Sequence, residues 1–237
     1  MRLDKFVCKS TLLNKQQVCI EIAAGKVTVN GKIILDIAHQ VHENNDVVFE
    51  KQRLIVRPFR YLMMNKPTNT ICSNIDEVYP SVLNLLNNAK YDESINNIDE
   101  LHIAGRLDAD TTGLILITDD GRWTYNITLP TNLCPKVYRV GLSKTFNPML
   151  VDIFKQGIQL QGEQQLTEPA KVEIVDEKEV LLTITEGKFH QVKRMFAAVG
   201  NRVVRLHREQ IGKIKLDVES EKWRFLTPLE INSVIRE

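Results

Sequence analysis

A loop near the middle of the chain carries residues that are suited to chemistry. The carboxylate Asp108 lies two positions after the cation Arg106, and glycines stand on both sides of them, at Gly105 and Gly113. Glycine lets a backbone turn sharply and lets a ligand come close. The apolar run 114–117 can anchor this loop on a buried strand, and loops held by rigid strands often carry catalytic residues. The same letters also suit an ordinary turn, because Asp and Thr side chains bond their own backbone.

Charge is distributed unevenly along the 237 residues, although the formal net charge is only +1. Residues 1–58 hold nine Lys and Arg against six Asp and Glu, a net charge of +3. Residues 187–215 hold eight Lys and Arg against the single acid Glu209, a net charge of +7. Two basic regions on a near-neutral chain favour a surface that binds a polyanion, whereas the simpler interpretation is a solvated charged face.

Cysteine spacing and hydropathy exclude several classes of protein. The four cysteines contain no Cys-x-x-Cys pair, which argues against a zinc site and against a disulfide framework. No apolar run has membrane-spanning length, and the N-terminus shows no signal-peptide core. We therefore expect a cytoplasmic protein with no metal site and no membrane segment.

The elements that begin the chain suggest a small separate module. After a first amphipathic helix, Asn14 and Gln17 have the spacing of a capping box, which predicts a second helix that ends at Gly25. The dipeptide Asn30-Gly31 between alternating apolar residues predicts a β-hairpin, and residues 47–49 predict a closing strand.

Over about residues 1–48 this module resembles the S4-like RNA-binding domain, through the segments 2–6 and 25–31. The resemblance implies that its two helices lie on a structured RNA and that its basic residues contact phosphates. Phosphate contacts position a protein on nucleic acid without reading the sequence. The expected RNA-binding residues are Arg2, Lys5, Lys9, Lys15 and Lys26.

Residues 50–60 have the character of a linker, so we expect domains at 1–58 and 59–237. The second part alternates many strands with few helices, which indicates an α+β class. The predicted fold is thus a small α/β module followed by a larger mixed, mainly antiparallel β-sheet with flanking helices. The expected strands are 61–64, 114–117, 136–140, 172–174, 180–184 and 203–206, and the expected helices lie at 80–86, 123–127, 149–154 and 190–199. Residues 87–100 are expected to form an exposed loop.

Three stretches of this second part match one family in order and spacing. They are Gly-Arg-Leu-Asp at 105–108, Lys-Val-Tyr at 136–138, and the run 186–195, which includes Phe-His-Gln-Val-Lys-Arg-Met. Together they resemble the pseudouridine synthases that modify ribosomal RNA, and most closely the bacterial small-subunit group. The resemblance implies that a uridine within RNA is detached from its sugar, rotated and rejoined through carbon, without a cofactor. It also implies that Asp108 is the essential residue, which either attacks the sugar carbon or removes a sugar proton.

The family motifs give roles to further residues. Lys193 corresponds to the basic partner that keeps the carboxylate ionised in a desolvating pocket, with Arg194 as the second candidate, although either cation could instead hold phosphate. Tyr138 would pack against the target base and serve in a later proton abstraction, and Leu206 would line the base pocket. Arg106 would fill the space left by the extruded nucleotide, since a guanidinium can stack and hold phosphate. A core tyrosine and a core leucine are the simpler alternatives.

Other functions remain open at this stage. Asp-x-Asp-x-Thr at 108–112 also fits the nucleophile loop of haloacid-dehalogenase-like phosphatases, which use magnesium in a doubly wound fold. A large-subunit enzyme of the same family and a non-catalytic assembly factor share most of these features. We expect the partner to be ribosomal RNA or a partly assembled small subunit, and the protein to be a monomer. Further acids of the region are expected to be turn or capping residues, namely Asp110, Asp119 and Asp120.

Overall fold

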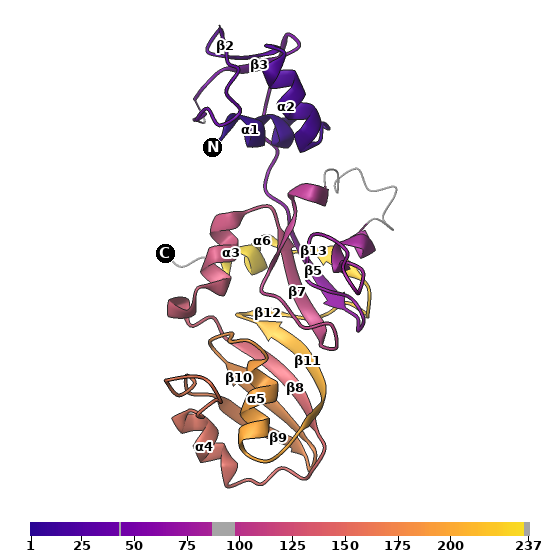
Figure 1. Cartoon of the computed structure of the whole chain (residues 1–237), viewed down its shortest axis with the longest axis vertical. Helices are drawn as coiled ribbons and strands as arrows, with labels where there is room; N and C mark the ends of the chain where they lie inside the picture. Colours follow the sequence, from indigo (N-terminus) through magenta and orange to yellow (C-terminus); the bar gives the residue numbers. More distant parts are fainter. Residues whose placement is uncertain (43, 87–97, 235–237) are drawn as a thin grey trace. The chain divides into compact units, whose positions relative to one another are not determined.

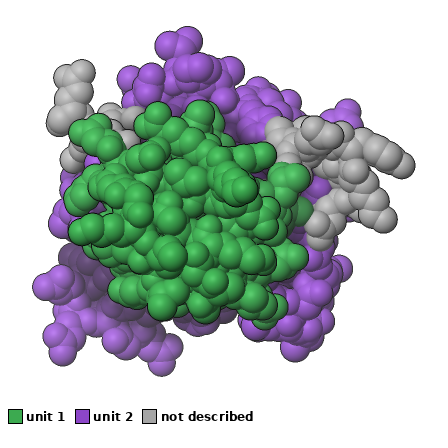
Figure 2. Space-filling model, turned by 90° about the horizontal axis from the view of Figure 1, so that it is seen from above, with its two compact units in different colours: residues 1–59, 89–101 green, residues 60–88, 102–237 purple. Residues whose placement is uncertain are grey.

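The structure, a computed structural model, describes residues 1–42, 44–86 and 98–234. The chain divides into two compact units, which Figure 2 distinguishes by colour. Unit 1 comprises Met1–Phe59 and Ala89–Leu101, and unit 2 comprises Arg60–Asn88 and His102–Glu237. None of the helices in the described ranges is long and apolar enough to cross a membrane.

Unit 1 contains two helices and a small antiparallel sheet with the order β2-β1-β3-β4. The helices are α1 (Leu3–Ser10) and α2 (Lys15–Ala23), and the strands are β1 (Val27–Val29), β2 (Lys32–Ile33), β3 (Val47–Phe49) and β4 (Gln52–Arg53). The predicted capping box is confirmed, because Asn14 and Gln17 each accept a hydrogen bond from the other's backbone N–H. The hairpin is confirmed as well, with φ of 51° at Asn30 and 77° at Gly31, as a type I′ turn requires.

The predicted basic residues of unit 1 have different environments. Lys5 and Lys15 are exposed, Arg2 pairs with Asp4, and Lys26 pairs with Glu21. Lys9 is only 6% exposed, and its ammonium nitrogen lies 3.9 Å from the centre of the Phe59 ring. Lys9 was expected to contact RNA, but it is one of the buried residues of α1 and is not presented at the surface.

Unit 2 is built on a nine-stranded sheet whose main path runs β13-β5-β7-β11-β8-β10-β9, with β12 paired to β11 and β6 paired to β7. Its strands are β5 (Tyr61–Lys66), β6 (His102–Ala104), β7 (Thr112–Thr118), β8 (Lys136–Leu142), β9 (Lys171–Asp176), β10 (Glu179–Ile184), β11 (Val203–Ile211), β12 (Ile214–Lys215) and β13 (Trp223–Phe225). Among these strands every pairing is antiparallel except that of β11 with β7. The α+β prediction is confirmed, and the doubly wound parallel sheet of the phosphatase alternative does not fit this topology.

The helices of unit 2 are α3 (Gly121–Thr128), α4 (Leu150–Gln156), α5 (Gln191–Ala198) and α6 (Pro228–Asn232). Figure 1 shows α3 and α6 beside the β5–β7 part of the sheet, and α4 and α5 beside the β8–β10–β9 part. The first part has a buried core that includes Trp123 and Ile127 from α3. The second part has a cluster of three aromatic rings, those of Phe146, Phe154 and Phe196. Each half of the sheet is therefore fixed by its own apolar layer.

The parallel pairing of β7 with β11 explains why the residue at position 113 is a glycine. Gly113 has φ of 106°, and a Cβ at this position would lie 2.3 Å from the backbone oxygen of Arg208. Any side chain would force the two strands apart, so this contact requires glycine. The close approach brings the end of the Asp108 loop directly beside β11.

Several elements differ from their predicted form. Residues Val82–Leu86 form a short 3-10 helix in place of an α-helix. Strands β4, β6, β12 and β13 and helix α6 were not predicted, and β4 lies within the segment 50–60 that was expected to be a linker. Of the expected loop at 87–100, residues 87–97 lie outside the described residues, and Ile98–Glu100 form a 3-10 turn.

Candidate active site

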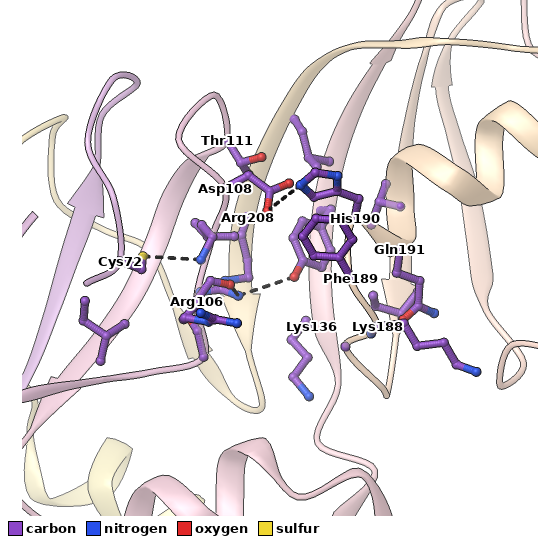
Figure 3. A pocket seen from close by; sticks show the side chains of 18 of the residues that line it. Cys72, Arg106, Asp108, Thr111, Lys136, Lys188, Phe189, His190, Gln191 and Arg208 are labelled. Atoms are coloured by element: carbon purple, nitrogen blue, oxygen red, sulfur yellow. Dashed lines mark hydrogen bonds and ion pairs between the residues drawn. The ribbon is translucent and has the colours of Figure 1, made fainter. Parts of the chain in front are cut away.

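A cavity of about 980 Å³ lies in unit 2 against the loop that carries Asp108. It is lined by residues of this loop, by β8 and β11, and by the turn that leads into α5. Figure 3 shows the labelled side chains of these segments converging on one space. The lining includes five predicted site residues, namely Arg106, Asp108, Tyr138, Lys193 and Leu206.

Asp108 and Lys193 meet at the edge of this cavity. The Lys193 ammonium donates hydrogen bonds to Oδ2 of Asp108 at 3.0 Å and to Oδ1 of Asp110 at 2.6 Å. His190 adds a further contact, since its Nε2 atom lies 3.5 Å from Oδ1 of Asp108. About one third of the Asp108 side chain is exposed, so the carboxylate is held by the Lys193 ammonium and remains accessible.

Lys193 and the two carboxylates that accept its hydrogen bonds form a cluster of opposite charges. Burial acts to lower the pKa of Lys193, but its hydrogen bonds to Asp110 and Asp108 outweigh this effect, so the pKa is raised above its ordinary value. The hydrogen bond from Lys193 lowers the pKa of Asp110. The ammonium therefore stays charged at neutral pH and favours the ionised form of Asp110. Asp110, expected only to shape a turn, also binds the cation.

Tyr138 and Leu206 lie on neighbouring strands at the inner part of the cavity, and each is 8% exposed. Between them and the loop lies Arg208, which is 2% exposed. Its guanidinium donates to the carbonyl oxygens of Leu114 at 2.8 Å and Gly105 at 2.7 Å. Longer contacts of 3.4 Å reach the Arg106 carbonyl and the Tyr138 hydroxyl. Arg208 thus connects the start of the Asp108 loop to the tyrosine.

A second buried cation holds the other end of the loop. Lys66, at the end of β5, is completely buried, and burial lowers its pKa. Its ammonium donates to the backbone oxygens of Pro67 at 2.9 Å and Thr111 at 3.0 Å, with a longer contact of 3.4 Å to Ala109. Lys66 and Arg208 therefore fix the backbone on both sides of Asp108.

The two remaining arginines of the prediction lie differently. Arg106 is exposed and lines the cavity. Arg194 is not among the lining residues. Its guanidinium donates to the carboxylate of Glu163 at 3.1 Å and to the carbonyl oxygen of Gln161 at 2.7 Å. The structure therefore brings Lys193, and not Arg194, to Asp108.

Three residues of the site were not predicted as site residues, namely Lys66, Arg208 and His190. His190 stood inside the matched motif, and its place as the first residue of a predicted helix was the available signal. Lys66 and Arg208 act through backbone carbonyl groups of a distant loop, which leave no residue pattern. Within the described ranges, no group of three or more His, Cys, Asp or Glu side chains is placed to hold a metal ion.

Comparison with known proteins agrees with this fold and site. Residues 60–198 match the family model described as RNA pseudouridylate synthase, and residues 1–47 match the S4 domain. The chain belongs to the RNA pseudouridylate synthase family, and the predicted resemblance is confirmed.

Relatives match along the full chain. It is 44% identical to "Ribosomal small subunit pseudouridine synthase A" of Vibrio cholerae, over 99% of each chain. The protein of the same name from Escherichia coli is also 44% identical, over 99% of this chain and 100% of that one. A crystal structure described as pseudouridylate synthase matches with a TM-score of 0.70 at 40% identity, over 99% of this chain and 100% of that one.

Proposed function

We propose that this protein converts a uridine of small-subunit ribosomal RNA to pseudouridine. The observation that carries the proposal is the pairing of Asp108 with Lys193 at 3.0 Å, in a cavity lined by Tyr138 and Leu206. The names of the full-length relatives support the same substrate. Domain roles follow, with residues 1–58 as the RNA-binding domain and 59–237 as the catalytic domain.

The reaction is an isomerisation with a simple balance of atoms. The bond between N1 of uracil and C1′ of the ribose breaks, the base rotates, and a bond from C5 to C1′ forms. The hydrogen on C5 leaves as a proton, and N1 gains one. Asp108 acts in its ionised form, either at the sugar carbon or on a sugar proton, and the chemistry calls for no cofactor.

The other residues bind and orient the nucleotide. The Lys193 ammonium stabilises the Asp108 carboxylate as the pocket closes on the base. Tyr138 and Leu206 hold the uracil, and the Tyr138 hydroxyl is placed to assist removal of the C5 proton. Arg106, exposed at the rim, occupies the space that the extruded nucleotide leaves. Extrusion costs about a few kcal/mol, which these contacts offset. Arg194 pairs with Glu163 and does not line the cavity, so any effect of Arg194 on RNA binding would be indirect.

The exposed basic residues of the S4 domain would contact rRNA phosphates, and they include Lys5 and Lys15. Arg2 and Lys26 also reach the surface, where each pairs with an acid. The substrate would be ribosomal RNA, free or within a partly assembled small subunit. We place the protein in the bacterial cytoplasm, where this RNA is made, and expect it to act as a monomer.

Release of tritium from RNA tests the proposal. Small-subunit rRNA transcripts are made with uridine that carries tritium at carbon five, and the released label is measured after incubation with the protein. A synthase releases this label from its target uridine. Large-subunit transcripts serve as the matched control. Label released from neither transcript would indicate a non-catalytic assembly factor. Label released only from large-subunit RNA would mean that large-subunit RNA is the substrate.

A further inference from the structure

We propose that Phe189 forms a stacking surface for an RNA base next to the target uridine. This inference rests on the proposed function, because it assigns a further subsite to the same RNA strand. Phe189 and His190 together form a surface that we call the aromatic shelf.

The aromatic shelf lies at the rim of the cavity beside Asp108. The Phe189 and His190 rings are stacked, with centroids 3.8 Å apart and planes inclined by 23°. Figure 3 shows the two rings together, with His190 turned toward Asp108. Phe189 is 74% exposed, more than any other described Phe, Tyr or Trp. Because His190 covers one face, the opposite face of the Phe189 ring is open to solvent.

Packing within unit 2 does not account for this phenylalanine. The apolar residues that follow it, Val192, Met195 and Phe196, are at most 5% exposed and form the buried side of α5. Phe189 precedes the helix and lines the cavity instead. An exposed aromatic ring at the rim of such a cavity offers a face on which a base can stack.

The turn that carries the shelf is held in place from several sides. His190 has a left-handed backbone, with φ of 48°. Arg194 donates a hydrogen bond to the Phe189 carbonyl at 3.1 Å, and Gln191 accepts one from the Lys188 backbone N–H at 2.8 Å. Gln191 also donates to Glu186 at 2.7 Å. A surface that is ordered before binding loses less entropy when the ligand arrives.

A nucleobase is the ligand that fits this surface. Aromatic rings beside cationic side chains are the usual composition of sites for single-stranded RNA, and Lys188, Lys193 and Arg106 line the same cavity. Tyr138 lies at the inner part of the cavity, where the extruded uridine would enter. Arg106 fills the gap that extrusion leaves within the strand, and the base next to the target uridine lies at the rim, where it stacks on the open face of Phe189.

Substitutions of Phe189 test the aromatic shelf in the full-length protein. Phe189→Ala removes the ring, Phe189→Leu keeps apolar bulk without a π-face, and Phe189→Trp keeps the π-face. The exposed residue Met149, 81% accessible at the N-cap of α4, provides the control Met149→Ala. KM and kcat are measured by tritium release from small-subunit rRNA transcripts, and Kd is measured on the same transcripts by filter binding.

The proposal predicts a KM and a Kd about tenfold higher for Phe189→Ala and Phe189→Leu, with kcat within about twofold. Phe189→Trp and Met149→Ala should match the wild type. An unchanged Kd for Phe189→Ala, or a Phe189→Leu protein that binds as tightly as Phe189→Trp, would overturn the shelf. If the wild type releases no tritium, the proposed function fails, while the Kd series still decides whether Phe189 stacks on RNA.

Discussion

The ammonium nitrogen of Lys193 lies 3.0 Å from Oδ2 of Asp108, although 85 positions separate the two residues in the chain. The sheet creates this contact. The loop of Asp108 leads into β7, β7 pairs with β11, and α5, which carries Lys193, packs against β11. The carboxylate and its cation are therefore placed by two elements that share one strand.

Lys193→Met should shift the acidic limb of the pH–rate profile to higher pH. Asp108 works only when ionised, and loss of the neighbouring cation makes its protonation easier, so activity is lost earlier as the pH falls. The direction follows from the loss of an ammonium that donates to Asp108 at 3.0 Å. The measurement is kcat/KM for tritium release across the acidic range.

Two variants control this experiment. Lys193→Arg keeps the charge and should keep the acidic limb close to that of the wild type. Asp110→Asn removes the second carboxylate on Lys193 but not the cation, so its profile should not move to higher pH. An unmoved limb for Lys193→Met, combined with weaker RNA binding and a shallower salt dependence, would mean that Lys193 holds phosphate.

Arg208→Lys should lower kcat by about ten- to a hundredfold, because one ammonium cannot replace the guanidinium contacts to Leu114, Gly105 and Tyr138. The loop backbone and the tyrosine would lose their shared support, while RNA binding should change little. Single-turnover rates and Kd on the same transcript separate the two effects. Wild-type kcat in Arg208→Lys would show that these contacts do not position the loop.

Lys66→Met should lower the free energy of unfolding by about 1–3 kcal/mol at neutral pH, because buried carbonyl groups lose their donor. The difference in the free energy of unfolding between the wild type and Lys66→Met should grow as the pH rises. Burial lowers the pKa of Lys66 in the folded protein below 10.5, so between that lowered pKa and 10.5 the unfolded chain binds more protons. Wild-type stability therefore rises across this window relative to Lys66→Met. Denaturant unfolding of both proteins at neutral and alkaline pH checks this, and a constant difference would contradict it.

Lys5→Gln with Lys15→Gln should flatten the salt dependence of RNA binding. Both lysines are exposed on unit 1, and removing one lysine–phosphate interaction reduces the slope of log K against log salt by roughly 0.7–0.9. Lys171→Gln, which removes an exposed charge from β9, is the control and should leave the slope unchanged. If the double variant keeps the wild-type slope, these two lysines do not meet phosphates.

Local patterns predicted much of the fold. The Asn14–Gln17 capping box and the Asn30-Gly31 turn depend on neighbours in sequence, and both are present. The short strand β13 was missed because it exists through its pairing with β5, whose residues lie far away in the chain. Lys9 was misplaced because its charge suggested the surface, whereas its position on α1 directs it inward.

The motif residues of the site could be predicted from the sequence, whereas the residues that hold the Asp108 loop in place, Lys66 and Arg208, could not. Asp108, Tyr138 and Leu206 line one cavity with Lys193, as the family motifs imply. Arg194 turns to Glu163, and adjacent positions on a helix point in different directions, so sequence alone did not separate it from Lys193. Asp110 was expected to serve a turn, yet its carboxylate lies 2.6 Å from the same ammonium.

The central claim is that the Asp108 carboxylate performs the chemistry. Asp108→Asn keeps the shape of the side chain and removes its charge, so RNA binding should stay within about twofold of the wild type. Tritium release from small-subunit rRNA transcripts, measured in single turnover with protein in excess, should fall by at least about a thousandfold. Release by Asp108→Asn at about a tenth of the wild-type rate or faster would contradict the account.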